Sequence, residues 1–183
     1  MQITVHGTPT KLDGRELLVG KEAPAARITT LEGTKNVIGM IAPTVQLLIA
    51  IPSLKTEVCS LGAKKFNELV QGLGKKLTTI MVTTDPIDFL QDYQKSEKIE
   101  NIQIVIDEDR SFAKKYGVLI SEGKLKDRLA RAVFVVDREG KISYKELVGE
   151  VVDEIAYEKC IEHVTALVNE KKKGHTHEEW MSV

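Results

Sequence analysis

The sequence predicts an α/β fold in which a mixed central sheet is flanked by helices. The apolar run VQLLIAI (45–51) has the length of a strand that is covered on both faces. Segments rich in β-branched residues alternate with segments of helical periodicity through the middle of the chain, which indicates parallel strands joined by helices. The turn DREGK (137–141) then joins two further strand-like segments, which indicates an antiparallel pair.

The N-terminal part is predicted to begin with a hairpin. VHGTP (5–9) has alternating apolar and polar residues on both sides, a pattern typical of two short strands and a turn. ARITTLEG (26–33) follows a stretch rich in glycine and proline, and it reads as a strand that ends at Gly33. The run 45–51 is then the first central strand.

After Pro52 the apolar period changes from that of a strand to that of a helix. A helical stripe is formed by Gly62, Phe66, Leu69, Val70 and Leu73, with Gly72 and Gly74 at its end. The segments that follow are predicted as strand 77–84, helix 86–97, strand 102–107, short helix 111–117, strand 131–137, strand 142–149 and helix 153–172. A hairpin followed by this order of elements is the outline of a thioredoxin-like fold.

The bulk composition excludes several classes of function. The 183 residues carry 26 basic and 27 acidic side chains, a net charge of −1, which argues against binding to nucleic acid. No window approaches the roughly 18 consecutive apolar residues that span a bilayer. The first residues lack the basic start and apolar block of a secretory signal, so we expect a cytoplasmic protein without a membrane partner.

Cys59, one of only two cysteines, lies at the start of the helix that follows the first central strand. Open α/β sheets hold their sites at the carboxyl ends of their strands, and a helix N-terminus stabilises a thiolate, the reactive form. Thr56 has a hydroxyl that can cap the helix or bond to the sulfur, and Pro52 fixes the backbone that leaves the strand. An arginine at the start of a core strand would supply a cation. On spacing alone, a buried and unreactive cysteine is the alternative.

These residues also carry a family resemblance. Pro52, Thr56 and Cys59 fit the pattern P-x-x-x-T/S-x-x-C, which resembles the signature of the peroxiredoxins, thiol-dependent peroxidases on a thioredoxin-like scaffold. The bacterial thiol peroxidase subfamily is similar in the blocks IPSLKTEVCSLGAKKFNEL (51–69), VHGTPTKLDG (5–14), KKYGVLI (114–120) and RLARAVFVVD (128–137). Because the resemblance covers about residues 2–168, we expect one domain of this kind over residues 1–170 and a polar tail over 171–183.

The resemblance implies a reaction and a role for each site residue. The expected substrates are hydrogen peroxide and organic hydroperoxides, and the expected reductant is thioredoxin or a low-molecular-weight thiol, in a homodimer that needs no cofactor or metal. Cys59 would be the nucleophile that becomes a sulfenic acid, and Thr56 would hold the peroxide oxygens. Pro52 would shield the sulfenic acid from solvent, and Arg131 would stabilise the thiolate and polarise the O–O bond.

The chain also departs from that subfamily. Gln94 takes the position of the usual resolving cysteine. Cys160 lies on the apolar stripe of the last helix, where a thiol is expected to be inert. We therefore expect a one-Cys mechanism with an external thiol, with an intermolecular or rearranged disulfide that involves Cys160 as the alternative. Lys55 and Glu57 replace the usual Asp and Gly beside the threonine, and their opposite charges leave the net effect on the thiolate open.

Two other interpretations follow from the same residues. Without a resolving cysteine the sulfenic acid would persist, which suggests a redox sensor whose oxidised Cys59 is recognised by a partner. A disulfide reductase is disfavoured because no C-x-x-C occurs in the chain. His175 and His177, two residues apart in the polar tail, are interpreted as incidental and not as metal ligands.

Overall fold

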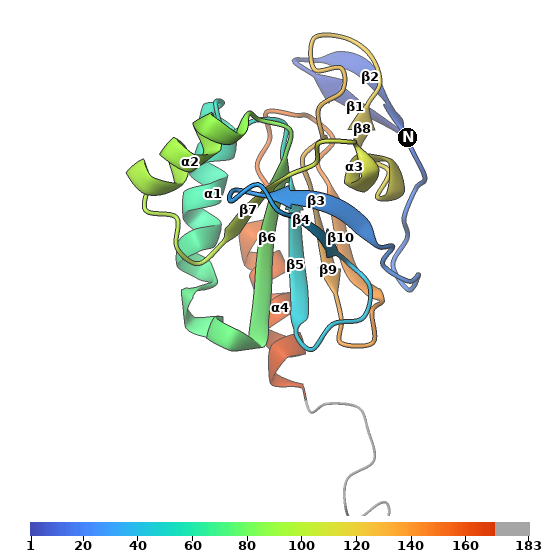
Figure 1. The fold of residues 1–183 in the computed structure, drawn as a ribbon. Coiled ribbons are helices and arrows are strands. Elements are labelled where there is room, and N and C mark those ends of the chain that lie inside the picture. The colour runs from blue at the N-terminus through green and yellow to red at the C-terminus, as the bar shows by residue number, and fades with distance from the viewer. Residues whose placement is uncertain (171–183) are drawn as a thin grey trace, which may run out of the picture.

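The computed structural model describes residues 1–170 and has a seven-stranded mixed sheet at its centre (Figure 1). Its strands are β3 (Ala26–Thr30), β4 (Lys35–Ile38), β5 (Val45–Ala50), β6 (Leu77–Thr83), β7 (Gln103–Ile106), β9 (Ala132–Val136) and β10 (Ile142–Leu147), in the order β10-β9-β5-β6-β7-β3-β4. The strands β5, β6 and β7 are parallel, and every other neighbouring pair is antiparallel. The predicted mixed sheet is confirmed.

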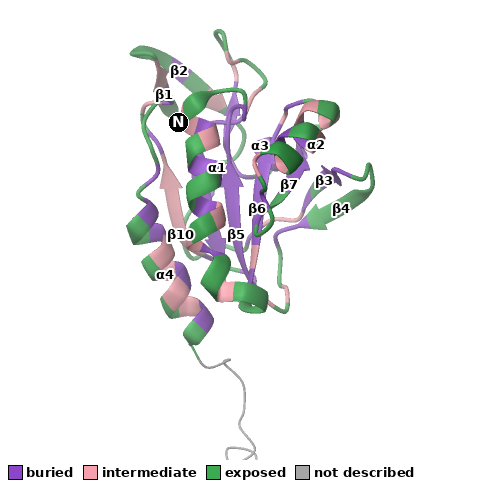
Figure 2. Cartoon of the chain, turned by 90° about the vertical axis from the view of Figure 1, so that its left-hand side faces the viewer, coloured by how far each residue is buried: buried purple, intermediate pink, exposed green. Residues whose placement is uncertain are grey.

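Helices cover both faces of this sheet. One face carries α1 (Glu57–Leu69), α2 (Ile87–Ser96) and α4 (Tyr157–Asn169); the other carries α3 (Ser111–Lys115) and a small sheet of β1 (Gln2–Val5), β2 (Thr8–Asp13) and β8 (Leu119–Ile120). Alternate side chains of β5 enter the two cores: Leu47 and Ile49 join the first, and Leu48 and Ala50 join the second. The strand β5 is buried along its whole length, as its apolar run predicted (Figure 2).

The predicted N-terminal hairpin is present as β1 and β2. His6 and Gly7 form the turn, with φ values of 50° and 81°. A two-residue hairpin turn needs positive φ at its central positions, which explains the glycine.

None of the helices in residues 1–170 reaches the length and apolarity that crossing a membrane requires.

Some predicted boundaries were wrong. The predicted strand 26–33 ends at Thr30, and Gly33 turns the chain into β4, an edge strand that the sequence pattern did not reveal. The helix predicted from residue 153 begins at Tyr157, and the residues before it form turns and irregular structure. The Glu146 carboxylate accepts the N–H of Ala156 at 2.9 Å and so stabilises the start of the helix at this point. The two-residue β8 was not predicted, and a 3-10 helix, η1 (Gln71–Lys76), ends the α1 segment. The predicted tail 171–183 lies outside the described residues.

Candidate active site

Cys59 lies in the first turn of α1, immediately beyond the carboxyl end of β5. A short loop from residue 51 to residue 56 connects the two elements. Thr56 takes the N-cap position with an extended backbone, and its carbonyl accepts the N–H of Ser60 at 3.0 Å to start the helix. The Cys59 side chain is 1% exposed. The thiol is therefore held at a helix N-terminus but under the surface.

Arg131 faces this thiol from the neighbouring strand. Because β9 runs antiparallel to β5 and Ala132 pairs with Ala50, the residue before β9 lies where α1 begins. Its Nη2 atom donates to Cys59 Sγ at 3.2 Å and to the carbonyl of Val151 at 3.1 Å. Arg131 is 4% exposed, and in the described part of the chain no ion pair includes it. A buried guanidinium without a carboxylate favours negative charge on the sulfur that it contacts.

Thr56 lies at the mouth of the site but does not cap the helix. Its hydroxyl donates to the carbonyl of Ser53 at 2.9 Å, and it makes no bond to the N–H groups of α1 or to the sulfur. Neither resting-state contact expected from the sequence is thus observed. The residue as a whole is exposed.

The loop before α1 is fixed by a buried carboxylate, Asp85, which sequence reasoning missed. Asp85 is 1% exposed and follows the carboxyl end of β6, beside the end of β5. Pro52 is also buried, and its carbonyl accepts a hydrogen bond from the Arg128 guanidinium at 3.4 Å. The Asp85 carboxylate accepts from the Ser53 hydroxyl (2.6 Å), the Leu54 N–H (2.7 Å), the Thr83 hydroxyl (3.2 Å) and the Arg128 guanidinium (3.3 Å). The position of Asp85, directly after the predicted strand 77–84, could have indicated its role from the sequence.

A small cavity lies behind the sulfur. Its volume is about 10 Å³, close to the minimum that one water molecule needs. Cys59, Arg131 and Tyr157 contribute its polar groups. The remaining lining residues are Ile49, Ile51, Gly62, Phe66, Met81 and Ile155.

The other residues of the redox prediction lie apart from this site. Both cysteines are free thiols. Cys160 is fully buried in α4, and burial raises the pKa of its thiol to about 12, so the thiol stays protonated, which agrees with the prediction that it is inert. The Gln94 side-chain amide donates to the carbonyl of Ile99 at 3.3 Å. Within residues 1–170 no group of three or more His, Cys, Asp or Glu could hold a metal ion, and His175 and His177 lie outside this range.

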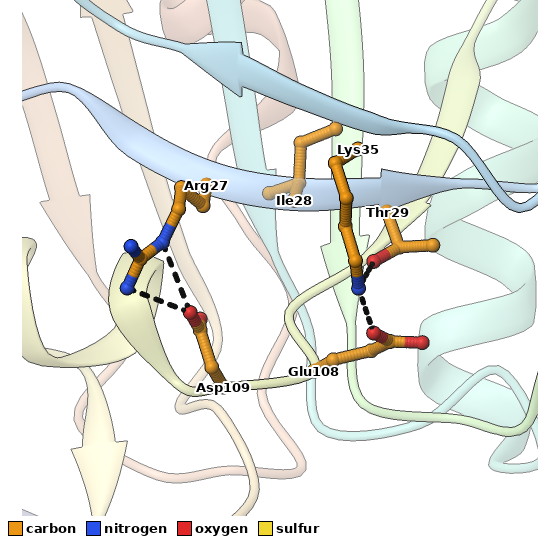
Figure 3. Close-up of a pocket in the computed structure, with 6 residues that line it drawn as sticks. All are labelled: Arg27, Ile28, Thr29, Lys35, Glu108 and Asp109. Carbon is orange, nitrogen blue, oxygen red and sulfur yellow. Dashed lines mark hydrogen bonds and ion pairs between the residues drawn. The ribbon is translucent and has the colours of Figure 1, made fainter.

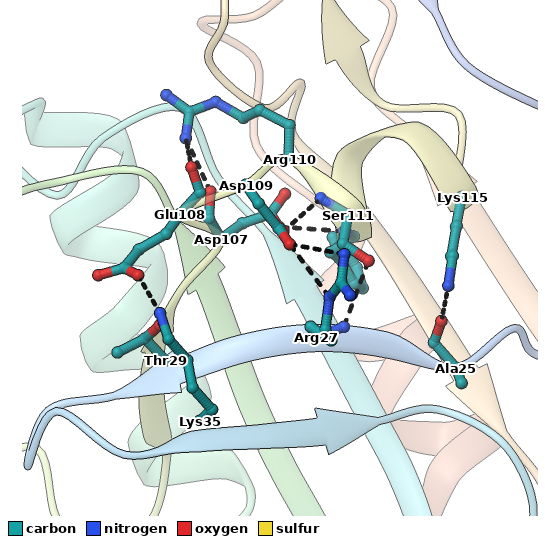
Figure 4. Close-up of polar contacts among 11 residues, drawn as sticks. Ala25, Arg27, Thr29, Lys35, Asp107, Glu108, Asp109, Arg110, Ser111 and Lys115 are labelled. Atoms are coloured by element: carbon teal, nitrogen blue, oxygen red, sulfur yellow. Dashed lines mark hydrogen bonds and ion pairs between the residues drawn. The ribbon is translucent and has the colours of Figure 1, made fainter.

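A larger pocket of about 210 Å³ opens elsewhere, at the β3–β4 edge of the sheet (Figure 3). We call its polar lining the edge cluster: Arg27, Thr29, Lys35, Glu108 and Asp109. Arg27 pairs with Asp109 at 3.0 Å, and Lys35 pairs with Glu108. Figure 4 shows these contacts continuing into the loop before α3, where the Arg110 guanidinium donates to the backbone carbonyls of Asp107 and Glu108. Each cation of this cluster has an anion, and no nucleophilic thiol is present, so these contacts join the β3–β4 hairpin to the loop.

The chain is similar to known proteins over most of its length. The sequence model of the family described as Redoxin matches residues 18–161. A thiol peroxidase of Aquifex aeolicus is 38% identical over 167 residues, which are 91% of this chain and 98% of that protein. A thiol peroxidase of Bacillus subtilis is 34% identical over 169 residues, again 91% and 98%.

Solved structures agree with these matches. The crystal structure of a peroxiredoxin-like protein from Aquifex aeolicus has a TM-score of 0.87 at 37% identity and covers 91% of this chain and 96% of its own. A thiol peroxidase from Chromobacterium violaceum has a TM-score of 0.81 with the same coverage of 91% and 96%. At 17% identity the second structure supports the fold alone.

Proposed function

The chain belongs to the redoxin family, and from that premise we propose that it is a thiol-dependent peroxidase whose nucleophile is Cys59. Its substrates are hydrogen peroxide and organic hydroperoxides, and its electrons come from an external thiol. The observation that carries the role of Cys59 is the 3.2 Å contact between Arg131 Nη2 and the sulfur. A buried cation that faces a thiol and no carboxylate is the electrostatic arrangement that an attacking thiolate needs.

The oxidation step follows from this arrangement. The Cys59 thiolate attacks one peroxide oxygen, an S–O bond forms, and the O–O bond breaks. The leaving oxygen takes a proton and departs as water or an alcohol, while the sulfur has lost two electrons and is a sulfenic acid. Arg131, the Thr56 hydroxyl and the free N–H groups at the start of α1 stabilise the charge that develops on the leaving oxygen. Pro52, buried in the loop, shields the sulfenic acid from solvent.

We propose a one-Cys route for the return step. A thiol of the reductant attacks the sulfenic sulfur, water leaves, and a second thiol breaks the mixed disulfide to restore Cys59. The support is twofold: Gln94 stands where the subfamily carries its resolving cysteine, and the Cys160 thiol is buried and protonated. Neither residue supplies a thiolate within the chain.

Steady-state consumption of hydrogen peroxide tests this function. Thioredoxin, glutathione and dithiothreitol are compared as reductants for the wild type, Cys59→Ser and the matched control Cys160→Ser. We expect many turnovers in the wild type and in Cys160→Ser, and none in Cys59→Ser. One stoichiometric burst that no reductant renews would indicate a sensor instead. A Cys59–Cys160 linkage in the mass spectrum of oxidised, unreduced protein would contradict the one-Cys route.

We propose the same setting for the enzyme as the resemblance implies. Residues 1–170 form the catalytic domain, with a polar tail over 171–183, and the working form is a homodimer in the cytoplasm. Free cysteines are compatible with that reducing compartment. Light scattering coupled to size-exclusion chromatography measures the oligomeric state, and a monomer at working concentration would contradict the dimer.

A further inference from the structure

Tyr157, the first residue of α4, forms part of the wall around the thiol. Its ring packs edge-on against Phe66 with centroids 5.0 Å apart, and the Lys65 ammonium lies 4.5 Å from its centroid. The side chain is 5% exposed and lines the cavity behind Cys59 together with Arg131. A tyrosine from the last helix thus reaches the site at the start of α1.

Gly62 makes room for the hydroxyl of this tyrosine. Glycine inside a helix is less stable than alanine by about 0.5–1 kcal/mol. A Cβ atom at position 62 would lie 2.7 Å from the Tyr157 hydroxyl oxygen, but 3.8 Å from the ring carbon that carries this oxygen. Phenylalanine at 157 would therefore leave ordinary van der Waals space for alanine at 62. Packing and helix stability alone would therefore favour alanine at position 62 together with phenylalanine at position 157. They do not explain why the chain has glycine and a tyrosine hydroxyl there.

The hydroxyl also differs from those of the other three tyrosines. Tyr93 bonds with the Ser60 hydroxyl at 2.9 Å. Tyr116 donates to a carbonyl at 2.8 Å, and Tyr144 donates to a carboxylate at 3.1 Å. The Tyr157 hydroxyl has no such hydrogen bond in residues 1–170, yet no fully enclosed side-chain oxygen there lacks a partner, so this oxygen must border open space. A hydroxyl that borders open space and has no acceptor in the protein can donate its proton to an oxygen atom that enters that space.

The electrostatic surroundings identify what this hydroxyl can offer. Burial raises the pKa of Tyr157 to about 12. The charges of Glu154, Cys59 and Glu146 act in the same direction, and Arg131 opposes them. The group is thus protonated at neutral pH and serves as a hydrogen-bond donor beside the thiol. The cavity has the volume of about one oxygen-sized group.

We propose that the Tyr157 hydroxyl binds the oxygen that Cys59 gains when it becomes a sulfenic acid, an inference that rests on the proposed function. The oxygen occupies the cavity between Cys59, Arg131 and Tyr157. Over-oxidation requires the sulfenic sulfur to attack a second peroxide, with a second S–O bond forming and the O–O bond breaking to give sulfinic acid and water or alcohol. A hydrogen bond to the first oxygen withdraws electron density from the sulfur and slows this attack. Tyr157 thereby keeps the oxidised enzyme recyclable.

The test follows the two oxidations of Cys59 separately. Wild type and Tyr157→Phe are treated with hydrogen peroxide, and the tryptic peptide 56–64 is scored by mass spectrometry for trapped sulfenic acid and for sulfinic acid. We expect the first oxidation to change by less than about twofold, and sulfinic acid to form about fivefold faster in the variant, the size of effect that one hydrogen bond gives. Sulfinic acid forming at the wild-type rate would overturn the inference. Absence of sulfenic acid in both proteins would overturn the proposed function as well.

Two matched variants separate the hydroxyl from packing. Tyr144→Phe removes a hydroxyl that already has a partner, and it should over-oxidise at the wild-type rate. Gly62→Ala alone should unfold more easily, because its Cβ meets the Tyr157 oxygen, whereas Gly62→Ala with Tyr157→Phe should be at least as stable as the wild type. The double variant should also over-oxidise as fast as Tyr157→Phe. Slow over-oxidation in this well-packed protein would show that the hydroxyl is not the cause.

Discussion

The thiol site and the edge cluster place arginine in opposite ways. Arg131 is 4% exposed and directs its guanidinium at the Cys59 sulfur and a backbone carbonyl. The Arg27 side chain is 72% exposed and pairs with Asp109, whose side chain is 46% exposed. In the edge cluster each cation is paired with a carboxylate. In the thiol site the buried Arg131 cation has no carboxylate partner, and it contacts the Cys59 sulfur, which carries a negative charge only as a thiolate.

This difference separates structural charges from functional ones. An exposed ion pair contributes about 0–1 kcal/mol and is weakened by salt, so the edge cluster adds little to stability and nothing to chemistry. Burying a cation without a carboxylate disfavours folding. Such an arrangement is typical of a site whose chemistry needs the charge. It supports our proposal that the smaller pocket, and not the larger edge pocket, is the functional one.

The largest effect is expected from removing the buried guanidinium. Arg131→Met keeps much of the side-chain volume but removes the donor to Cys59, so the rate constant for oxidation by peroxide should fall about 100-fold or more. Arg27→Met, the matched change in the edge cluster, should leave it within about twofold. Stopped-flow oxidation under single-turnover conditions measures this rate, and the ultraviolet absorbance of the thiolate shows whether ionisation is reduced. Equal effects of the two substitutions would show that the buried arginine has no special role in the reaction.

The second prediction concerns the carboxylate that fixes the loop. Asp85→Asn weakens a buried network that joins the Ser53 hydroxyl, the Leu54 N–H and Arg128. We expect the free energy of unfolding to fall by about 2–3 kcal/mol, and peroxide oxidation to slow because the loop that carries Thr56 is less well held. Asp109→Asn at the edge should cost less than about 1 kcal/mol. Urea denaturation measures both, and a change at Asp85 no larger than at Asp109 would contradict the prediction.

A smaller effect is expected at Thr56. Thr56→Val removes the hydroxyl that we propose to hold the peroxide, and the oxidation rate should fall about tenfold, the size of one lost hydrogen bond. Thr56→Ser should restore most of the rate. Thr29→Val, which removes a hydroxyl bonded to Lys35 in the edge cluster, serves as the control and should have no effect on the rate. If Thr56→Val oxidises at the wild-type rate, the hydroxyl has no part in the step.

Sequence patterns predicted the sheet and the position of the thiol for clear physical reasons. Apart from Gln46, the run 45–51 is apolar on both alternating sets of positions, because β5 is covered on both faces. Cys59 follows it at the start of a helix, and the antiparallel pairing of β9 with β5 brings Arg131 beside the sulfur. Periodicity was enough for the sheet and the start of the helix, whereas the family resemblance was needed to single out Arg131.

The missed features depend on contacts between distant segments. The polar edge strand β4 has three exposed residues among its four, so its pattern carries no buried face to detect. Asp85 accepts a hydrogen bond from Ser53, which lies 32 residues earlier in the chain. The start of α4 is decided by Glu146, which accepts the N–H of Ala156 from the end of β10. Tyr157 lies three residues before Cys160, and only the fold shows that its hydroxyl occupies the space beside Gly62 that a Cβ atom would need.

His163 is less buried than Arg131 and more buried than Arg27. The smallest expected effect is that of this histidine on the pH dependence of stability. His163 is partly buried in α4, its Nε2 lies 3.0 Å from the Ser143 hydroxyl, and burial lowers its pKa. The unfolded chain, with an ordinary histidine pKa of about 6.5, therefore takes up a proton at a higher pH than the folded protein does. The contribution of His163 to stability is complete above about pH 6.5, and it is lost as the pH falls from there toward the lower pKa of the folded state.

Thermal unfolding measured between about pH 7.5 and pH 5 checks this sign, since that range brackets the ordinary histidine pKa. His163→Gln should lose less stability on acidification than the wild type does. His6→Asn, at an exposed turn with positive φ that asparagine tolerates, should keep the wild-type dependence. If His163→Gln follows the wild-type curve, partial burial of this ring does not affect its titration, and the contrast between buried and exposed charges is confined to the thiol site.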